Sequence, residues 1–271
     1  NSGEKLKHLN GLMKTVFLTT DSAPAKFIAT HLHNRGFLDA IIIEKSAAKT
    51  KTKILKELKS ASWGKVPVKI LDFLAIYVYS KLAKRYIDNH LLRPNHIDGF
   101  PSGVTSHQVE DASGSQCLST LKSMAPDILI VLGTSILKPE VLSVAKRYTL
   151  NIHGGIVPQY RNVHSDFWAA SKNDFKNIGT SIIHLDPGVD TGNIAIQDSV
   201  KITSGDTLFS IKKKNIELSL CLITQAIEMA ETGDLPGTPQ LKIQGGFHKT
   251  PGLMDFFRLF ATTFNNIKIF S

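Results

Sequence analysis

The sequence predicts an α/β protein built on a mostly parallel β-sheet with helices packed against it. Two observations carry this prediction. Lys14–Thr20 has the pattern of a buried strand, the residues up to Gly36 that of a helix, and Leu38–Lys45 that of a second strand. A strand–helix–strand unit of this kind makes parallel neighbours. Ile128–Leu132 is a continuous apolar run, which is typical of a central strand in a parallel sheet.

The other predicted elements continue this alternation of strands and helices. The first helix takes Asp21 or Ser22 as its N-cap, since both side chains can accept from the first free N–H groups. The later elements are, in chain order, a helix reaching about Met124, a short helix from Pro139, a strand over 149–153, a helix from Ser165, strands over 179–186 and 194–202, a helix from Asp206 to about Thr232, and a last helix over 252–264.

The segment Lys49–Leu92 is mostly helical in pattern and forms an insert between predicted strands. We expect it to cover the sheet and not to enter a membrane, because Lys81, Lys84 and Arg85 interrupt its apolar run. We therefore expect an N-terminal extension over 1–13, a main domain over 14–234 that contains this insert at about 49–92, and a C-terminal extension over 235–271.

The composition is that of an ordinary globular protein, with 271 residues of which 42% are apolar and 20% charged. It shows neither an apolar run of membrane-spanning length nor a secretion signal at the start. Cys117 and Cys221 lie far apart in the sequence, so we expect two buried thiols in a reducing cytoplasm.

The formal net charge of +9 favours anionic partners, such as nucleic acid, a phosphorylated substrate or an acidic cofactor. Much of this charge lies in Glu44–Lys59, where no aromatic residues alternate with the basic ones. That segment is typical of a solvated helix face, not of a surface that stacks bases. The turn "TTDSAPAK" after the first strand has neither a dinucleotide nor a P-loop motif, and no cluster has metal-ligand spacing.

A candidate catalytic group follows from three polar residues. Asn151 and His153 are two residues apart, so they share one face of a strand end, and Asp190 lies in a later loop flanked by glycines. An amide can donate to a developing oxyanion, a histidine can move a proton near neutral pH, and a carboxylate can hold that histidine. These groups suit acyl-type transfer onto an amine without a covalent enzyme intermediate. By spacing alone, a polar strand end bonded to its own turn is the alternative.

The stretches "PDILIVLGTSILKPEVL", "LNIHGGIVPQYR", "FWAA" and "GTSIIHLDPGVDTGNI" occur in this order and closely resemble the formyltransferase family. That family includes methionyl-tRNA formyltransferase, glycinamide ribonucleotide formyltransferase and sugar N-formyltransferases. The resemblance covers about Lys14 to Gln240 and is densest between Pro126 and Gln197. It implies a Rossmann-like sheet without a nicotinamide site, so that 14–234 would be a formyltransferase catalytic domain.

The resemblance also implies a donor and roles for the site residues. The donor would be 10-formyltetrahydrofolate, with no metal required. Asn151 and His153 would stabilise the tetrahedral oxyanion, while Asp190 would keep His153 cationic and assist removal of the amine proton. The pteridine of the donor would lie against the loop and backbone formed by Gly133, Thr134, Ser135, Ile136, Leu137, Pro187, Gly188 and Val189.

Two departures from the family pattern fall beside the candidate catalytic strand. Gly154 and Gly155 stand where many members have Pro-Ser, and Asn162 replaces the glycine of "YRG". Asn tolerates positive φ, so we expect the turn to be kept. Residues that would contact the acceptor lie in the same stretch: Tyr160, Arg161, His164 and Asp166. For the last two, a solvated loop is an equal alternative.

We expect the acceptor to be an amino sugar carried on a nucleotide. Too few residues follow Gly233 for the C-terminal barrel that helps the translation enzyme hold tRNA, and the purine enzyme lacks the helical insert. The expected protein is a cytoplasmic homodimer with neither a membrane nor a nucleic-acid partner. The alternatives are formylation of another amine (aminoacyl-tRNA or glycinamide ribonucleotide), a formyltetrahydrofolate hydrolase, or a non-catalytic binding module of the same fold.

Overall fold

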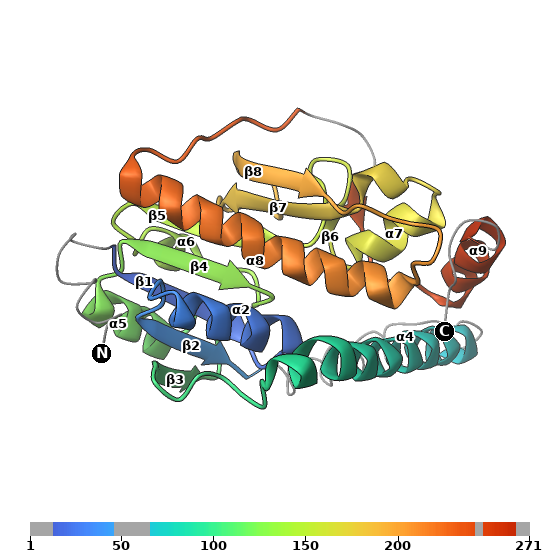
Figure 1. Cartoon of the computed structure of the whole chain (residues 1–271), viewed down its shortest axis with the longest axis horizontal. Coiled ribbons are helices and arrows are strands. Elements are labelled where there is room, and N and C mark those ends of the chain that lie inside the picture. The colour runs from blue at the N-terminus through green and yellow to red at the C-terminus, as the bar shows by residue number, and fades with distance from the viewer. Residues whose placement is uncertain (1–12, 46–65, 242–245, 264–271) are drawn as a thin grey trace.

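The computed structural model describes residues 13–45, 66–241 and 246–263, which form a seven-stranded sheet with helices on both faces (Figure 1). Most of the predicted N-terminal extension, residues 49–65 of the insert and parts of the C-terminal extension lie outside these ranges. The sheet order is β3-β2-β1-β4-β5-β7-β8. Its strands are β1 (Thr15–Thr20), β2 (Ala40–Glu44), β3 (Thr105–Val109), β4 (Ile128–Leu132), β5 (Tyr148–His153), β7 (Gly179–His184) and β8 (Ile194–Ser199).

The first five strands of this sheet are mutually parallel, while β7 is antiparallel to both β5 and β8. The prediction of a mostly parallel α/β sheet is therefore confirmed. β3 was not predicted, because its residues "TSHQV" are nearly all exposed and carry no apolar pattern. A separate two-residue ladder pairs β6 (Arg161–Asn162) with β9 (Phe247–His248).

Helices cover both faces of the sheet (Figure 1). The first face carries α2 (Ala23–Asn34) and α8 (Leu208–Thr232), and the second carries α5 (Ser115–Met124) and α6 (Pro139–Leu142). Ser22 caps α2, as one of the two predicted options. The cap of α8 is Thr207 and not the predicted Asp206, because the Thr207 hydroxyl accepts from the Ser210 N–H.

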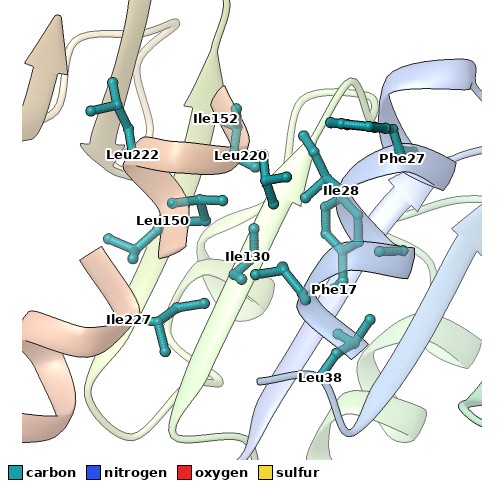
Figure 2. Packing of buried hydrophobic residues seen from close by; sticks show 14 of the residues in the cluster. Phe17, Phe27, Ile28, Leu38, Ile130, Leu150, Ile152, Leu220, Leu222 and Ile227 are labelled. Carbon is teal, nitrogen blue, oxygen red and sulfur yellow. The ribbon is translucent and has the colours of Figure 1, made fainter. Parts of the chain in front are cut away.

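The main core lies between the sheet and the α2/α8 layer (Figure 2). Phe17 from β1, Ile130 from β4 and Leu150 from β5 contact Ile28 and Ile227 of the helices within one buried cluster. Each such side chain contributes roughly 1.5–3 kcal/mol of transfer free energy when it leaves water. This packing fixes the strands rigidly, and with them the loops at their carboxyl ends. In the part of the chain that is described, no helix is long and apolar enough to cross a membrane.

The long helix α4 (Val66–Ile87) extends beyond the sheet instead of covering it (Figure 1). Tyr79 and Ala83 pack in a second cluster with residues of α7 (Ser165–Ser171), α8 and α9 (Leu253–Thr263). Of the residues of α4, Ile87 joins the core over the sheet. The expectation that this insert packs over the sheet is therefore wrong for most of α4. A π-helical turn (Asp88–Leu92) and a 3-10 turn (Arg93–Asn95) follow it.

The two cysteines differ in environment. Cys117 is buried, and desolvation together with nearby Glu44 and Asp111 raises the pKa of its thiol to about 11. Cys221 on α8 is exposed, so the expectation of two buried thiols is wrong for this residue. Cys221 lies on the outer side of α8, away from the core. The helical repeat alone does not show which side of α8 faces solvent.

Candidate active site

The carboxyl ends of β1, β4 and β5 meet at the point where the strand order reverses direction. In open α/β sheets, this is where ligands bind. A cavity of about 600 Å³ opens there. Asp21 and Ser22 after β1, Leu132 at the end of β4, and His153 at the end of β5 belong to its wall. The volume falls in the usual range for small-molecule sites.

Asp190 is the residue that connects the predicted catalytic group. Its Oδ1 accepts from the Asn151 side-chain amide at 3.1 Å, and its Oδ2 lies 3.4 Å from Nδ1 of His153. Asp190 is buried and has a positive φ of 52°, which aspartate adopts more readily than most residues. Gln240 holds the same loop by donating to the backbone carbonyls of Asp190 and Gly192. The structure thus brings Asn151, His153 and Asp190 into contact.

His153 is 6% exposed, and both of its ring nitrogens face acceptors. Nδ1 faces the Asp190 carboxylate, and Nε2 lies 2.7 Å from the Tyr160 carbonyl oxygen. An imidazolium, with two N–H donors, satisfies both contacts, whereas a neutral ring satisfies only one. These two contacts hold the His153 ring in place beside Asp190.

The turn after β5 depends on small residues. A Cβ on Gly155 would lie 2.5 Å from the Ser165 side chain and 2.6 Å from the Tyr160 carbonyl oxygen, so only glycine fits. Asn162 has a φ of 76°, which confirms that this turn keeps a positive φ without glycine. Its backbone N–H donates to Asp190 Oδ2 at 2.8 Å. The turn that carries Asn162 therefore helps to hold the catalytic carboxylate.

Asp166 and Lys212 form a charged pair in the cavity wall. Lys212 Nζ, from α8, lies 2.7 Å from Asp166 Oδ2, and the Asp166 side chain is 5% exposed. Burial alone would raise the pKa of Asp166, but the Lys212 ammonium and further hydrogen bonds outweigh it and lower that pKa. The alternative of a solvated loop is wrong for Asp166, because it lies in the first turn of α7 inside the protein.

His164 lies beside this pair and also belongs to the cavity wall. Burial and the Lys212 ammonium lower the pKa of His164 to about 4, against a smaller opposing effect of Asp166. It is therefore neutral at physiological pH and can donate or accept one hydrogen bond. Its φ of 56° is positive, which fixes its direction at the start of α7.

Two more lysine–aspartate pairs belong to the same wall. Lys26 and Asp21 are 2.7 Å apart near the start of α2, and Lys84 pairs with Asp88 at the end of α4. An ammonium has three N–H donors, so a lysine held by one carboxylate keeps donors for a ligand. The cavity thus combines fixed cations with the apolar surfaces of Ile28, Ile152 and Ile216.

The predicted donor loop, Gly133 to Leu137, lies on the other side of the strand ends, next to α5 and α6. Its Leu137 packs with Val141, and Leu185 from the strand leading to Pro187 packs in the same cluster. The side chain of Ile136 is 73% exposed. Gly133, Pro187 and Gly188 are exposed, while Thr134, Ser135 and Val189 are half-buried. Open backbone around one exposed apolar side chain fits a flat heterocycle.

Glu44 holds the Gly133–Leu137 loop in place through hydrogen bonds, and sequence reasoning did not select it. It is 2% exposed at the end of β2. Its Oε1 accepts from the Ala112 N–H and the Ser135 hydroxyl, and its Oε2 accepts from the Ser135 N–H at 2.8 Å. An acidic residue that ends an apolar strand, as in "IIIEK", is the one signal that could have identified it.

Tyr160 and Arg161 are placed differently from His164 and Asp166. The Tyr160 hydroxyl donates to Asp174 at 2.9 Å and its ring stacks on His248, so its side chain faces a packing cluster. Arg161 lies in the β6–β9 ladder. Neither belongs to the cavity wall. Among the described residues, no group of three His, Cys, Asp or Glu side chains is arranged to hold a metal ion.

Among the cavity residues that the sequence did not reveal are three lysines, Lys212, Lys26 and Lys84. Lys212 stands in the run "KKK" of α8, and its two neighbours point elsewhere: Lys213 pairs with Glu217 and Lys214 with Asp206. The helical repeat alone leaves open which lysine faces the site, because that depends on how α8 is rotated against the sheet.

Comparison with known proteins gives a consistent result. The model of the family described as formyl transferase matches residues 40–227. A methionyl-tRNA formyltransferase from Methylacidiphilum infernorum is 34% identical over 134 residues, which is 49% of this chain and 42% of that protein. The chain thus matches less than half the length of this relative.

Solved structures resemble this fold over most of the chain. A sugar N-formyltransferase from Shewanella sp FDAARGOS_354 is 13% identical with a TM-score of 0.55, covering 92% of this chain and 87% of that one. WlaRD, a sugar 3N-formyl transferase solved in the presence of dTDP and 5-N-formyl-THF, is 16% identical with a TM-score of 0.53, covering 87% of this chain and 69% of that one. At these identities the likeness concerns the fold.

Proposed function

This chain belongs to the formyl transferase family, and from that premise we propose that it transfers a formyl group from 10-formyltetrahydrofolate to a primary amine. The single observation that carries the proposal is the bridging of Asn151 and His153 by the Asp190 carboxylate at the end of β5. This group stands between an open loop on one side and a polar cavity on the other.

In the proposed reaction, the acceptor amine attacks the formyl carbon from the cavity side. Asn151 uses one amide hydrogen on Asp190 and has a second hydrogen to donate to the oxyanion. His153 supplies another by exchanging its contact with the Tyr160 carbonyl for the oxyanion, which is the stronger acceptor. The new bond joins the amine nitrogen to the formyl carbon.

The collapse of the tetrahedral intermediate breaks the bond between that carbon and N10 of the folate. The amine loses one proton, which Asp190 accepts through water, and N10 gains one as it leaves. The products are a formamide and tetrahydrofolate. WlaRD was solved with a folate and a nucleotide, which supports the same pair of ligands here. The donor would lie against the Gly133–Leu137 and Pro187–Val189 segments.

We propose a nucleotide-linked amino sugar as the acceptor. The three lysine–aspartate pairs of the wall keep N–H donors for phosphate oxygens, and the volume of about 600 Å³ suits a small molecule. His164 and Asp166, at the start of α7, are proposed to contact the sugar near the amine.

A panel of nucleotide-linked amino sugars, assayed with 10-formyltetrahydrofolate, tests this proposal. We expect amine-dependent release of tetrahydrofolate together with a formylated sugar. Formate release without any amine would indicate a hydrolase instead. Absence of folate turnover with every amine would overturn the enzyme proposal and leave a binding module of the same fold.

The sequence relatives favour aminoacyl-tRNA as the second candidate acceptor, because the M. infernorum match is named for that substrate. The net charge of +9 is also compatible with RNA. A gel shift with charged tRNA at low and physiological salt separates the two acceptors. If the amino-sugar proposal holds, any tRNA complex should dissociate at physiological salt and yield no formylated product.

A further inference from the structure

The outer side of α4 carries apolar residues that no described part of the chain covers. Residues Tyr79, Ala83 and Ile87, spaced four apart, form the buried side of the helix. The opposite side carries the α4 stripe, whose members are each 43–59% exposed: Ile70, Leu71, Leu74, Tyr77, Val78 and Leu82. Large apolar side chains gathered on one helix face mark an interaction surface.

The helix that packs on α4 adds to this exposed apolar surface. The Leu253 N–H, at the start of α9, donates to Asp72 of α4. Three large apolar side chains of α9 are exposed: Met254 at 68%, Phe257 at 59% and Phe260 at 42%. Two contacting helices at the end of the molecule that extends beyond the sheet therefore both present apolar residues to solvent (Figure 1).

Basic residues continue the α4 stripe toward the end of the helix. Lys81 and Arg85 are exposed and occupy the same helix face, three to four residues after Tyr77, Val78 and Leu82. The Lys81 ammonium lies 5.4 Å from the centre of the Tyr77 ring. A surface hollow at this end is lined by Lys81, Lys84, Arg85 and Arg93 together with Leu82, Asp88 and Asn89.

The charge around the stripe is mainly positive. Residues 66–95 contain five basic and two acidic residues. Asp72 is turned toward α9, and Asp88 pairs with Lys84. A second copy of this chain would bring like charges together at this face, which is unfavourable. Apolar residues beside lysine and arginine suit the surface of an anionic bilayer, where the apolar side chains enter the acyl boundary and the cations meet phosphates.

We propose that the α4 stripe and its basic end dock this protein on an anionic membrane surface. α4 would lie in the plane of the headgroups, and phosphate groups would occupy the hollow of Lys81, Lys84, Arg85 and Arg93. Lys84 and Asp88 belong to both this hollow and the acceptor cavity, so docking places the cavity wall next to the headgroups. This proposal differs from the sequence expectation of no membrane partner.

Vesicle sedimentation tests the proposal without any assay of formyl transfer. The full chain is incubated with vesicles of phosphatidylcholine alone or mixed with phosphatidylglycerol. We expect binding to the anionic vesicles that weakens with salt, and much less binding to the neutral ones. Lys81→Glu with Arg85→Glu should weaken this binding by roughly 25-fold or more, because each basic residue near the surface contributes about fivefold.

Two further variants separate the apolar and electrostatic contributions. Leu74→Glu with Val78→Glu, both at exposed positions, should abolish binding while the circular dichroism spectrum stays unchanged. The matched control for Lys81→Glu with Arg85→Glu is Lys122→Glu with Lys138→Glu, which makes the same change in net charge at exposed positions on the α5/α6 side and should bind like the parent.

Three outcomes would overturn the proposal. One is no binding of the parent protein to anionic vesicles, and another is equal loss in the control variant. The third is a dimer in light scattering that Leu74→Glu with Val78→Glu dissociates while vesicle binding is absent, which would identify the face as a contact between two copies.

Discussion

The two sides of the β5 carboxyl end are built in opposite ways. On the α2/α8 side, the cavity wall contains three lysine–aspartate pairs and half-buried His164. On the α5/α6 side, the Gly133–Leu137 loop is open to solvent, and one buried carboxylate, Glu44, fastens it. Fixed charge suits a phosphorylated acceptor, whereas open backbone beside an apolar side chain suits a flat donor.

Asp190 contacts both Asn151 and His153 at the end of β5, so its loss should have the largest effect. Asp190→Asn keeps a residue that tolerates the φ of 52° but removes the negative charge facing His153. We expect turnover to fall by roughly a thousandfold with the fold retained. Stopped-time assays and circular dichroism measure this, with exposed Asp198→Asn as the control. Near-normal turnover in Asp190→Asn would show that the site is wrongly assigned.

Lys212→Met tests the role of the fixed charges on the cavity side. It leaves Asp166 buried without its cation and should lower the free energy of unfolding by roughly 2–3 kcal/mol, less than a fully buried pair because Lys212 is partly exposed. It should also raise KM for the acceptor and not for the donor. Lys213→Met removes the adjacent lysine, whose Glu217 partner is at the surface, and should change neither.

Adding Asp166→Asn to Lys212→Met should restore part of the lost stability, because the unpaired charge is gone. Urea unfolding of the parent, Lys212→Met and the double variant tests this coupling. If the double variant is no more stable than Lys212→Met, the ion pair is not the source of the loss.

Glu44→Gln tests the role of the buried carboxylate that holds the Gly133–Leu137 loop. Glutamine places an N–H₂ group against an N–H donor, which should cost roughly 1–3 kcal/mol and loosen Ser135. KM for 10-formyltetrahydrofolate should then rise roughly tenfold while KM for the acceptor stays the same. Glu110→Gln, an exposed carboxylate paired with Lys45, is the matched control. A rise confined to the acceptor KM would contradict the assignment of this loop.

The smallest expected effect is a pH dependence from His164. Its folded pKa of about 4 lies below the ordinary value of 6.5, so the unfolded chain takes up a proton first as pH falls. Stability is full above pH 6.5 and should decline by about 1 kcal/mol by pH 5.5. His164→Asn, which suits the φ of 56°, should remove this part of the decline.

Thermal unfolding of the parent, His164→Asn and His96→Asn at pH 7.0 and 5.5 measures that contribution. His96 also has a positive φ, of 54°, but is exposed, so its replacement controls for backbone effects. An unchanged pH dependence in His164→Asn would mean that other groups account for the acid sensitivity. Asp166 is not among them in this range, because its pKa is lowered from the ordinary 3.8 and its contribution to stability is lost only as pH falls through that value and below.

Much of the fold could be predicted because apolar patterns report burial. Ile128–Leu132 was predicted with the limits that β4 has, and Ser165, Gly179 and Ile194 begin α7, β7 and β8 as expected. β3 was missed because an exposed edge strand needs no apolar side chains. α4 was assigned to the wrong neighbours, since an apolar helix does not specify what it packs against.

By itself, the sequence determined most of the strands and helices, because periodicity is a local property. It also singled out Asn151, His153 and Asp190 as candidates, through their residue types and the family resemblance. Only the tertiary structure decided that Asp190 bridges the other two, that Lys212 and not Lys213 faces the cavity, and that Glu44 fastens the loop. It also decided that one side of α4 stays exposed. These contacts join residues far apart in the chain, and the rotation and packing of whole elements set them.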